Sequence, residues 1–337
     1  MKNLFFAAAV AALACAGCTA EDDPVTPTPP LHEIPVNFST SISKISRATP
    51  ITGTAFAADA EIAVYGTETK GDVVTPEWMN YVKLTQTDGD WTYDNPKNFK
   101  IGYKYSFVAY APYSAALDMQ TLTAVPYLVG NMAAQKDLLI VPSVKKDYST
   151  TAPKSGDQVG LVFKHALSQV MFSAVTSADY AASYEVKITN IELKGLVSSG
   201  KLDFTSDSGS WTLDAAIADY SQSVSASVGA LSNGETATSL KSDDGVLMLI
   251  PQSPAGKDLI LTLAVTAKAG GDATIAGNAK NITIKFPADD PAWAAGHAYT
   301  YKITLNLDET FGWSAGFSAP TITEWVTDDP ERPITNQ

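Results

Sequence analysis

Beyond residue 60 the chain alternates apolar runs rich in Val, Ile, Tyr, Phe and Thr with short stretches of Gly, Asp, Asn and Pro. The residues of the runs favour β-strands, and the residues between them favour turns. The pattern predicts strands at residues 61–66, 80–86, 103–112, 137–141, 160–175, 184–195, 245–252, 258–265, 281–286 and 298–307. Strands and turns at this spacing are typical of β-sandwiches, so we expect an all-β fold.

A further strand is expected close to the N-terminus, over residues 34–42. Its apolar side chains all fall at even positions, with mostly polar or small residues between them: Ile34, Val36, Phe38 and Ile42. A period of two places these side chains on one face of a strand. The following residues, Ser-Arg-Ala-Thr-Pro at 46–50, are typical of an exposed linker.

Two shorter stretches also predict local structure. Asp88 and Gly89 in DGDWTYD indicate a tight hairpin turn, because the segment lacks the later ligands of a calcium loop. Residues 287–296 indicate a short helix, with Asp290 as its cap and Pro291 in its first turn.

The first residues of the chain predict export. One Lys precedes an apolar run from Leu4 to Ala14, and small residues precede Cys18. The run is shorter than the roughly 20 apolar residues that span a bilayer. Cys15-Ala16-Gly17 before Cys18 resembles a bacterial lipobox, so we expect palmitate or a similar acyl chain on Cys18. The alternative is an ordinary secretory signal that is cut nearby.

Composition narrows the range of partners. Residues 19–33 are rich in Pro, Thr and acidic residues, which predicts an extended tether. The net charge is -13 and the chain has only two arginines, so it offers no basic face for nucleic acid. The acidity also argues against binding of anionic membranes by the folded part.

The sequence offers no set of residues for catalysis. The three histidines, His32, His165 and His297, lie outside any metal-binding spacing, and His165 is interpreted as structural. The chain has no Gly-rich phosphate loop and no G-x-S-x-G motif. We therefore expect no enzyme, no catalytic or metal-binding residue and no cofactor.

Several strings resemble the fimbrillin family, the subunits of surface fimbriae (type V pili) in Bacteroides-like anaerobes. They are AEIAVYG (60–66), YSFVAYAPY (105–113), KDLLIVPS (136–143), LVFKHALSQVMF (161–172), LMLIPQ (247–252), AWAAGHAYTYKITL (292–305) and ITEW (322–325). The resemblance implies two tandem transthyretin-like β-sandwich domains and export to the cell outer membrane as a lipoprotein. It also implies cleavage by an arginine-specific protease, loss of the first strand, and its replacement by a strand from another fimbrial subunit (donor strand exchange).

This resemblance sets the expected division of the chain. Residues 1–17 are the lipoprotein signal peptide, and residues 18–47 are the tether and propeptide with the first strand. The N-terminal β-sandwich spans 48–157, because the turn-rich stretch 150–158 is the expected boundary. The C-terminal β-sandwich and the C-terminal segment span 158–337.

The expected maturation site is the bond between Arg47 and Ala48, in the exposed linker where proteolysis concentrates. The second arginine, Arg332, precedes Pro333, and proteases generally avoid such a bond. Cleavage after Arg47 removes the strand at 34–42. A sheet that lacks a strand exposes apolar side chains and unpaired backbone groups that another subunit can cover by β-strand addition.

The expected donor is the C-terminal stretch of residues 319–337. Ile322 and Val326 share one face of this stretch and Trp325 lies on the other, whereas later prolines weaken strand pairing. Two alternatives remain at this point. One is an anchor or tip subunit of the fimbrium that keeps its lipid and is never cut. The other is a surface lipoprotein that binds glycans through exposed aromatic residues.

Overall fold

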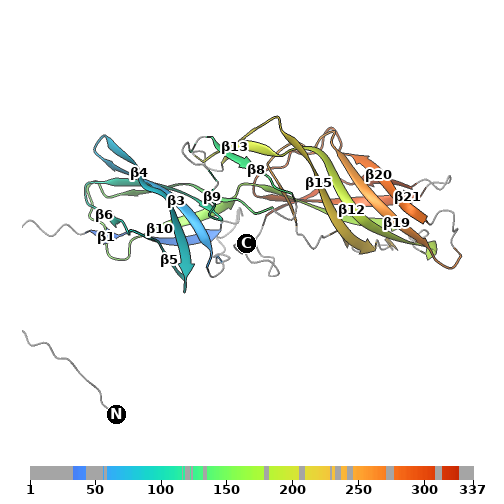
Figure 1. Ribbon diagram of the computed structural model, residues 1–337, viewed down its shortest axis with the longest axis horizontal. Helices are drawn as coiled ribbons and strands as arrows, with labels where there is room; N and C mark the ends of the chain where they lie inside the picture. The colour runs from blue at the N-terminus through green and yellow to red at the C-terminus, as the bar shows by residue number, and fades with distance from the viewer. Residues whose placement is uncertain are drawn as a thin grey trace, which may run out of the picture.

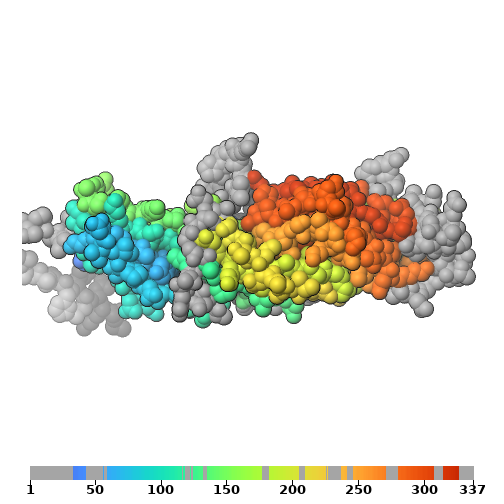
Figure 2. All heavy atoms as spheres, turned by 90° about the horizontal axis from the view of Figure 1, so that it is seen from above, coloured from blue at the N-terminus to red at the C-terminus, as the bar shows by residue number. Residues whose placement is uncertain are grey.

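The computed structural model describes residues 33–42, 56, 59–115, 117, 122, 124–131, 135–177, 182–204, 209–227, 230–231, 237–240, 246–270, 277–307 and 313–325. The regular structure in these residues is nearly all β, as the sequence predicts. The molecule is elongated, and two β-rich halves follow each other along its long axis (Figures 1 and 2).

The N-terminal half is built on one seven-stranded sheet. Its strands are, in spatial order, β2 (Asn37–Ile42), β10 (Gln158–His165), β9 (Leu139–Asp147), β7 (Lys104–Ala111), β3 (Glu61–Lys70), β4 (Val73–Thr87) and β5 (Asp90–Thr92). A short strand before β2, β1 (Ile34–Pro35), pairs with β6 (Asn98–Phe99). The sheet is curled so that its two edge strands meet. Trp91 of β5 donates a hydrogen bond to the Thr40 hydroxyl of β2 across this contact.

The C-terminal half is a sandwich. One sheet has the order β16 (Ala230–Leu231), β11 (Ser168–Ser177), β21 (His297–Leu307), β22 (Trp313–Phe317), with β17 (Thr238–Ser239) and β18 (Leu247–Leu249) on β11 and β23 (Thr321–Glu324) on β21. The facing sheet has the order β15 (Ile217–Ser227), β12 (Tyr184–Val197), β19 (Asp258–Ala267), β20 (Gly277–Lys285). Apolar side chains of both sheets form one buried cluster, which is how a sandwich excludes water from its core.

The predicted boundary between the halves differs from the observed one. The apolar run at 160–175 is two strands, since β10 ends at His165 and β11 begins at Ser168. β10 belongs to the first sheet and β11 to the second, so the sheets change after His165 rather than after residue 157. Both strands have a buried apolar face, and no Gly or Pro stands between them, so the sequence carries no mark of the break.

A second crossing joins the two halves. β8 (Val125–Leu128) comes from the N-terminal part of the chain, yet it pairs with β13 (Ser199–Asp203), which also pairs with β14 (Ser210–Leu213). Figure 1 shows β8 and β13 side by side between the two halves. A simple division at one position of the sequence therefore does not describe the fold.

The turn at Asp88 and Gly89 is confirmed as a hairpin between β4 and β5. Thr87 pairs with Asp90, and both turn residues have positive φ angles of 51° and 96°. Such angles favour the Asp-Gly pair because Gly has no Cβ to clash with the backbone.

The helix expected at 287–296 is wrong, because these residues form two turns, at 288–289 and 295–296, and otherwise have no regular structure. Trp293 is 2% exposed, and its indole N–H donates to the Tyr301 hydroxyl at 2.9 Å. That hydroxyl donates to Asp290 at 2.7 Å, so the expected capping residue bonds a strand instead. Burial of Trp293 among the aromatic side chains of the core outweighs the local helix signals.

Two carboxylates stabilise the turns between β9 and β10, and they belong to Asp147, the last residue of β9, and to Asp157. The pKa of Asp147 is lowered to about 2 by hydrogen bonds from Ser149, and the pKa of Asp157 is lowered chiefly by the backbone N–H of Lys154. Both folded-state pKa values lie below that of an unfolded Asp, about 3.9, so their stabilisation is present above pH 4. It is lost as the pH falls through the folded-state values.

We therefore expect the free energy of unfolding to fall between about pH 4 and pH 2, and to fall less steeply in an Asp147→Asn, Asp157→Asn double variant. Urea unfolding at a series of pH values measures both slopes. Equal slopes in the two proteins would contradict the assignment.

Candidate functional site: the leading strand and the C-terminal edge

The strand predicted at 34–42 is part of the sheet. β2 runs parallel to β10, with Phe38 opposite Val159, Thr40 opposite Leu161 and Ile42 opposite Phe163. The side chains of its apolar face are 1–5% exposed: Val36, Phe38 and Ile42. The leading segment is therefore a full structural member of the N-terminal half, not a loose tether.

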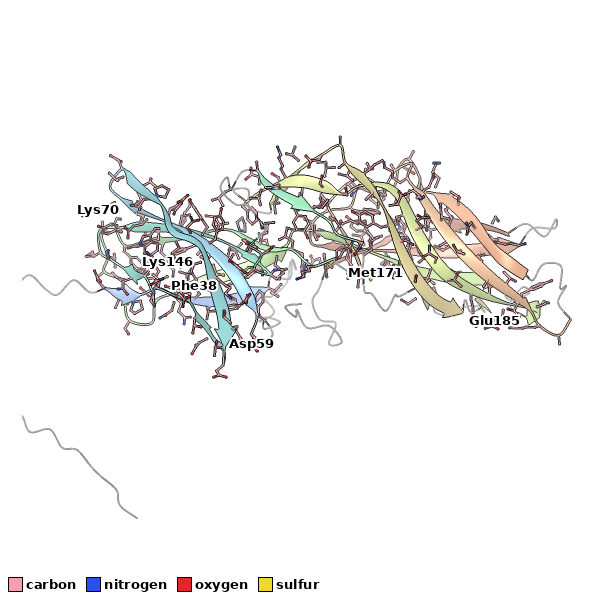
Figure 3. All side chains as sticks on the ribbon, viewed as in Figure 1. Phe38, Asp59, Lys70, Lys146, Met171 and Glu185 are labelled. Carbon is pink, nitrogen blue, oxygen red and sulfur yellow. The ribbon has the colours of Figure 1, made fainter. Side chains whose placement is uncertain are left out.

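Phe38, labelled in Figure 3, is a buried side chain of the N-terminal half. Its ring meets Tyr93 and Phe107 edge-on, each with a centroid distance of 5.8 Å. Edge-to-face contacts of this kind add to the stabilisation that burial of a phenyl ring provides. Phe38 is thus the main apolar anchor of β2.

Three hydrogen bonds hold the other side of the segment. The Tyr93 hydroxyl donates to the carbonyl of Val36 at 3.0 Å, and the backbone N–H of Val36 donates to the carbonyl of Lys97 at 2.9 Å. Trp91 donates its indole N–H to the Thr40 hydroxyl at 3.0 Å. The segment is therefore held between β10 on one side and the β5–β6 region on the other.

Loss of β2 would change this half of the molecule sharply. The side chains of β10 that β2 covers are completely buried: Val159, Leu161 and Phe163. Removal of β2 would expose these side chains together with the backbone N–H and C=O groups of β10 that now pair with it. The space that β2 occupies is called the β2 groove below.

Four of the residues expected to act in export, maturation and assembly lie outside the described residues: Cys18, Arg47, Ala48 and Val326. β2 ends at Ile42, five residues before Arg47 in the sequence. The roles expected for these residues remain predictions.

The other donor candidates, Ile322 and Trp325, lie along the edge of the C-terminal half. β23 pairs with the start of β21, from Thr300–Thr321 to His297–Glu324. Ile322 in β23 is 45% exposed, whereas Trp325, directly after the strand, is 9% exposed. This segment thus pairs with a sheet of its own chain in the structure.

Trp325 is the buried anchor of this edge. Its ring stacks on His165 with a centroid distance of 4.3 Å and an interplanar angle of 10°. His165 contacts Asp137 through Nδ1 at 2.7 Å, and the backbone N–H of Trp325 donates to Gly296 at 2.8 Å. His165 is 4% exposed, and sequence spacing gave no sign of its contact with Trp325.

The same strand, β10, therefore contacts both ends of the folded chain. Its residues 158–163 pair with β2, and His165 at its end stacks on Trp325. Within the described residues, no group of three His, Cys, Asp or Glu side chains is placed to hold a metal ion. The features that stand out are strand edges and aromatic anchors, which suit binding of a polypeptide segment.

The model of the fimbrillin-like family matches residues 46–325. The chain belongs to the fimbrillin-like family. Its match begins after β2 and ends at Trp325, so it covers most of the N-terminal half and the C-terminal half but not the leading strand.

Two solved structures have a fold similar to that of this chain. A fimbrial protein from Bacteroides vulgatus has a TM-score of 0.62 at 16% identity, over 86% of this chain and 99% of that one. A candidate cell adhesion protein from Bacteroides ovatus has a TM-score of 0.55 at 15% identity, over 89% of this chain and 99% of that one. A search of curated proteins finds no match.

Proposed function

We propose that this fimbrillin-like protein is a structural subunit of surface fimbriae. Membership of the family and a fold shared with a fimbrial protein support this role and a place at the cell surface. One observation carries the mechanism: β2 completes the core of the N-terminal half and lies just before the linker that contains Arg47. A strand in that position closes a groove that another subunit could fill.

The precursor begins as an outer-membrane lipoprotein in this proposal. The signal peptide is removed, and acyl chains on Cys18 tether the chain to the membrane through residues 19–33. An arginine-specific protease then cuts between Arg47 and Ala48. The cut separates β2 covalently from the rest of the protein, so β2 can leave the groove.

A strand from the next subunit then enters the β2 groove. The proposed donor is the C-terminal segment, with Ile322, Trp325 and Val326 among its residues. β23 suits this role because it is an edge strand whose own side chains are mostly exposed, and Trp325 is its one buried anchor among the described residues. Contacts that lead from one copy to the next without closing generate a filament.

Replacement of Arg47 by Ala in the cells that make the protein tests the proposal. We expect the variant to stay uncut and the number of filaments to fall at least about tenfold, because β2 cannot leave. Arg332→Ala is the matched control, since the bond before Pro333 is a poor substrate, and it should leave filaments unchanged. N-terminal sequencing of surface material and electron microscopy give the two readouts.

The opposite result favours the other role in the fimbrium. Wild-type filament numbers with an intact N-terminus at acylated Cys18 would contradict cleavage and indicate an anchor or tip subunit. Loss of filaments in both arginine variants would show that the effect is not specific to Arg47.

A further inference from the structure

The β2 groove contains one hydrogen-bond donor that a replacement strand must satisfy. Trp91 is almost fully buried, and its indole N–H donates to the Thr40 hydroxyl at 3.0 Å. An indole nitrogen can only donate, so no rotation of Trp91 turns it into an acceptor. A buried N–H that loses its acceptor is strongly unfavourable, so a strand that covers Trp91 again must bring an oxygen to this place.

A second requirement lies two residues earlier on the same face of the strand. Phe38 fills the space between Tyr93 and Phe107, with edge-to-face contacts to both rings. A smaller side chain would leave a cavity there, and a charged one would be buried without a partner. The side chains of β2 thus indicate which side chains the β2 groove can accept.

On the basis of the proposed function, we infer that the β2 groove selects strands with an aromatic residue and, two residues later, a hydroxyl. Backbone pairing with β10 does not depend on sequence, so these two side chains supply the selectivity. The partner runs parallel to β10, as β2 does.

The C-terminal segment of a second copy meets this requirement. Trp325 and Thr327 are two residues apart, and they would take the places of Phe38 and Thr40. The opposite face of the segment fits worse, because Ile322 in the place of Phe38 has no aromatic ring to meet Tyr93 and Phe107 edge-on. In the favoured register the poorest match is Asp329, which falls at the place of Ile42 at the end of the β2–β10 ladder.

Peptide exchange in the nicked protein tests the selectivity. The full chain is cut after Arg47 with an arginine-specific protease, or at a protease site engineered between residues 43 and 50 if Arg47 resists. Labelled peptides then compete with the severed leading segment for the groove. The first set copies residues 33–42, with Thr40→Val as the test and Asn37→Ala, an exposed position, as the control.

We expect the Thr40→Val peptide to bind about 10- to 100-fold more weakly than the copy, and the control within about twofold. A chain with Trp91→Phe lacks the indole N–H, so there the Thr and Val peptides should bind equally. For a peptide of residues 319–331, Thr327→Val should weaken binding and Asp329→Ile should strengthen it.

The outcomes separate this inference from the proposed function. If no peptide enters the groove, including the copy of β2, strand addition itself is overturned. If the copy enters but Thr40→Val binds as well as Thr, or loses the same factor in the Trp91→Phe chain, the hydroxyl requirement is overturned while strand addition stands. If Ile322→Ala weakens the C-terminal peptide and Thr327→Val does not, the assigned register is overturned.

Discussion

Replacement of Phe38 by Ala is expected to destabilise the N-terminal half by about 3–5 kcal/mol, the usual cost when a buried phenyl ring is removed. The ring is 5% exposed and lies between Tyr93 and Phe107, so its loss leaves a cavity between these two rings. Because β2 is an edge strand, we also expect it to detach more often and expose the groove. Urea unfolding of the full chain measures the first effect, and size-exclusion chromatography detects any self-association that follows.

The matched control is Asn37→Ala, at the neighbouring exposed position of the same strand. Its free energy of unfolding should stay within about 0.5 kcal/mol of the wild-type value. A change of less than about 1 kcal/mol in Phe38→Ala, or a similar change in both variants, would show that β2 is not anchored through this ring.

Replacement of Trp325 by Ala should release β23 from β21 while the rest of the C-terminal half stays folded. Trp325 is the buried side chain at this edge, and its stacking on His165 is lost in the variant. Removal of a buried Trp costs about 3 kcal/mol, which corresponds to roughly a hundredfold faster hydrogen exchange of the amides in β23. Hydrogen exchange followed by mass spectrometry resolves the peptides of this region.

Ile322→Ala is the control, because this side chain of the same strand is exposed at 45%. It should leave exchange nearly unchanged, and Trp325→Phe should retain most of the protection because a smaller ring can still stack on His165. Unchanged exchange in Trp325→Ala would mean that backbone pairing alone holds β23. In that case the segment would not be poised for release as the proposed donor role requires.

Much of the fold was accessible from the pattern of the sequence. The alternation of Val36, Phe38 and Ile42 predicted β2, and these side chains are indeed buried. The Asp88-Gly89 pair predicted its hairpin because few residues adopt positive φ angles. Such signals are local, since they depend on side-chain period and backbone conformation within a few residues.

The errors arose where distant residues determine the structure. The run that contains His165 was predicted as one strand, because it is apolar throughout although its two parts belong to different sheets. No helix forms near Trp293, because its indole ring packs against Phe286 and its N–H donates to Tyr301, and both partners lie outside the predicted helix. Neither contact leaves a trace in the local pattern.

For the candidate site, too, some features could be predicted from the sequence and others could not. By itself the sequence determined that the chain is β-rich and that an amphipathic strand precedes the linker with Arg47, because both follow from the period of a strand. Only the tertiary structure decided that β2 pairs with β10, that Trp91 finds its acceptor on Thr40, and that Trp325 stacks on His165. These contacts join residues more than 50 positions apart, and they form only when burial of apolar surface brings those distant strands together.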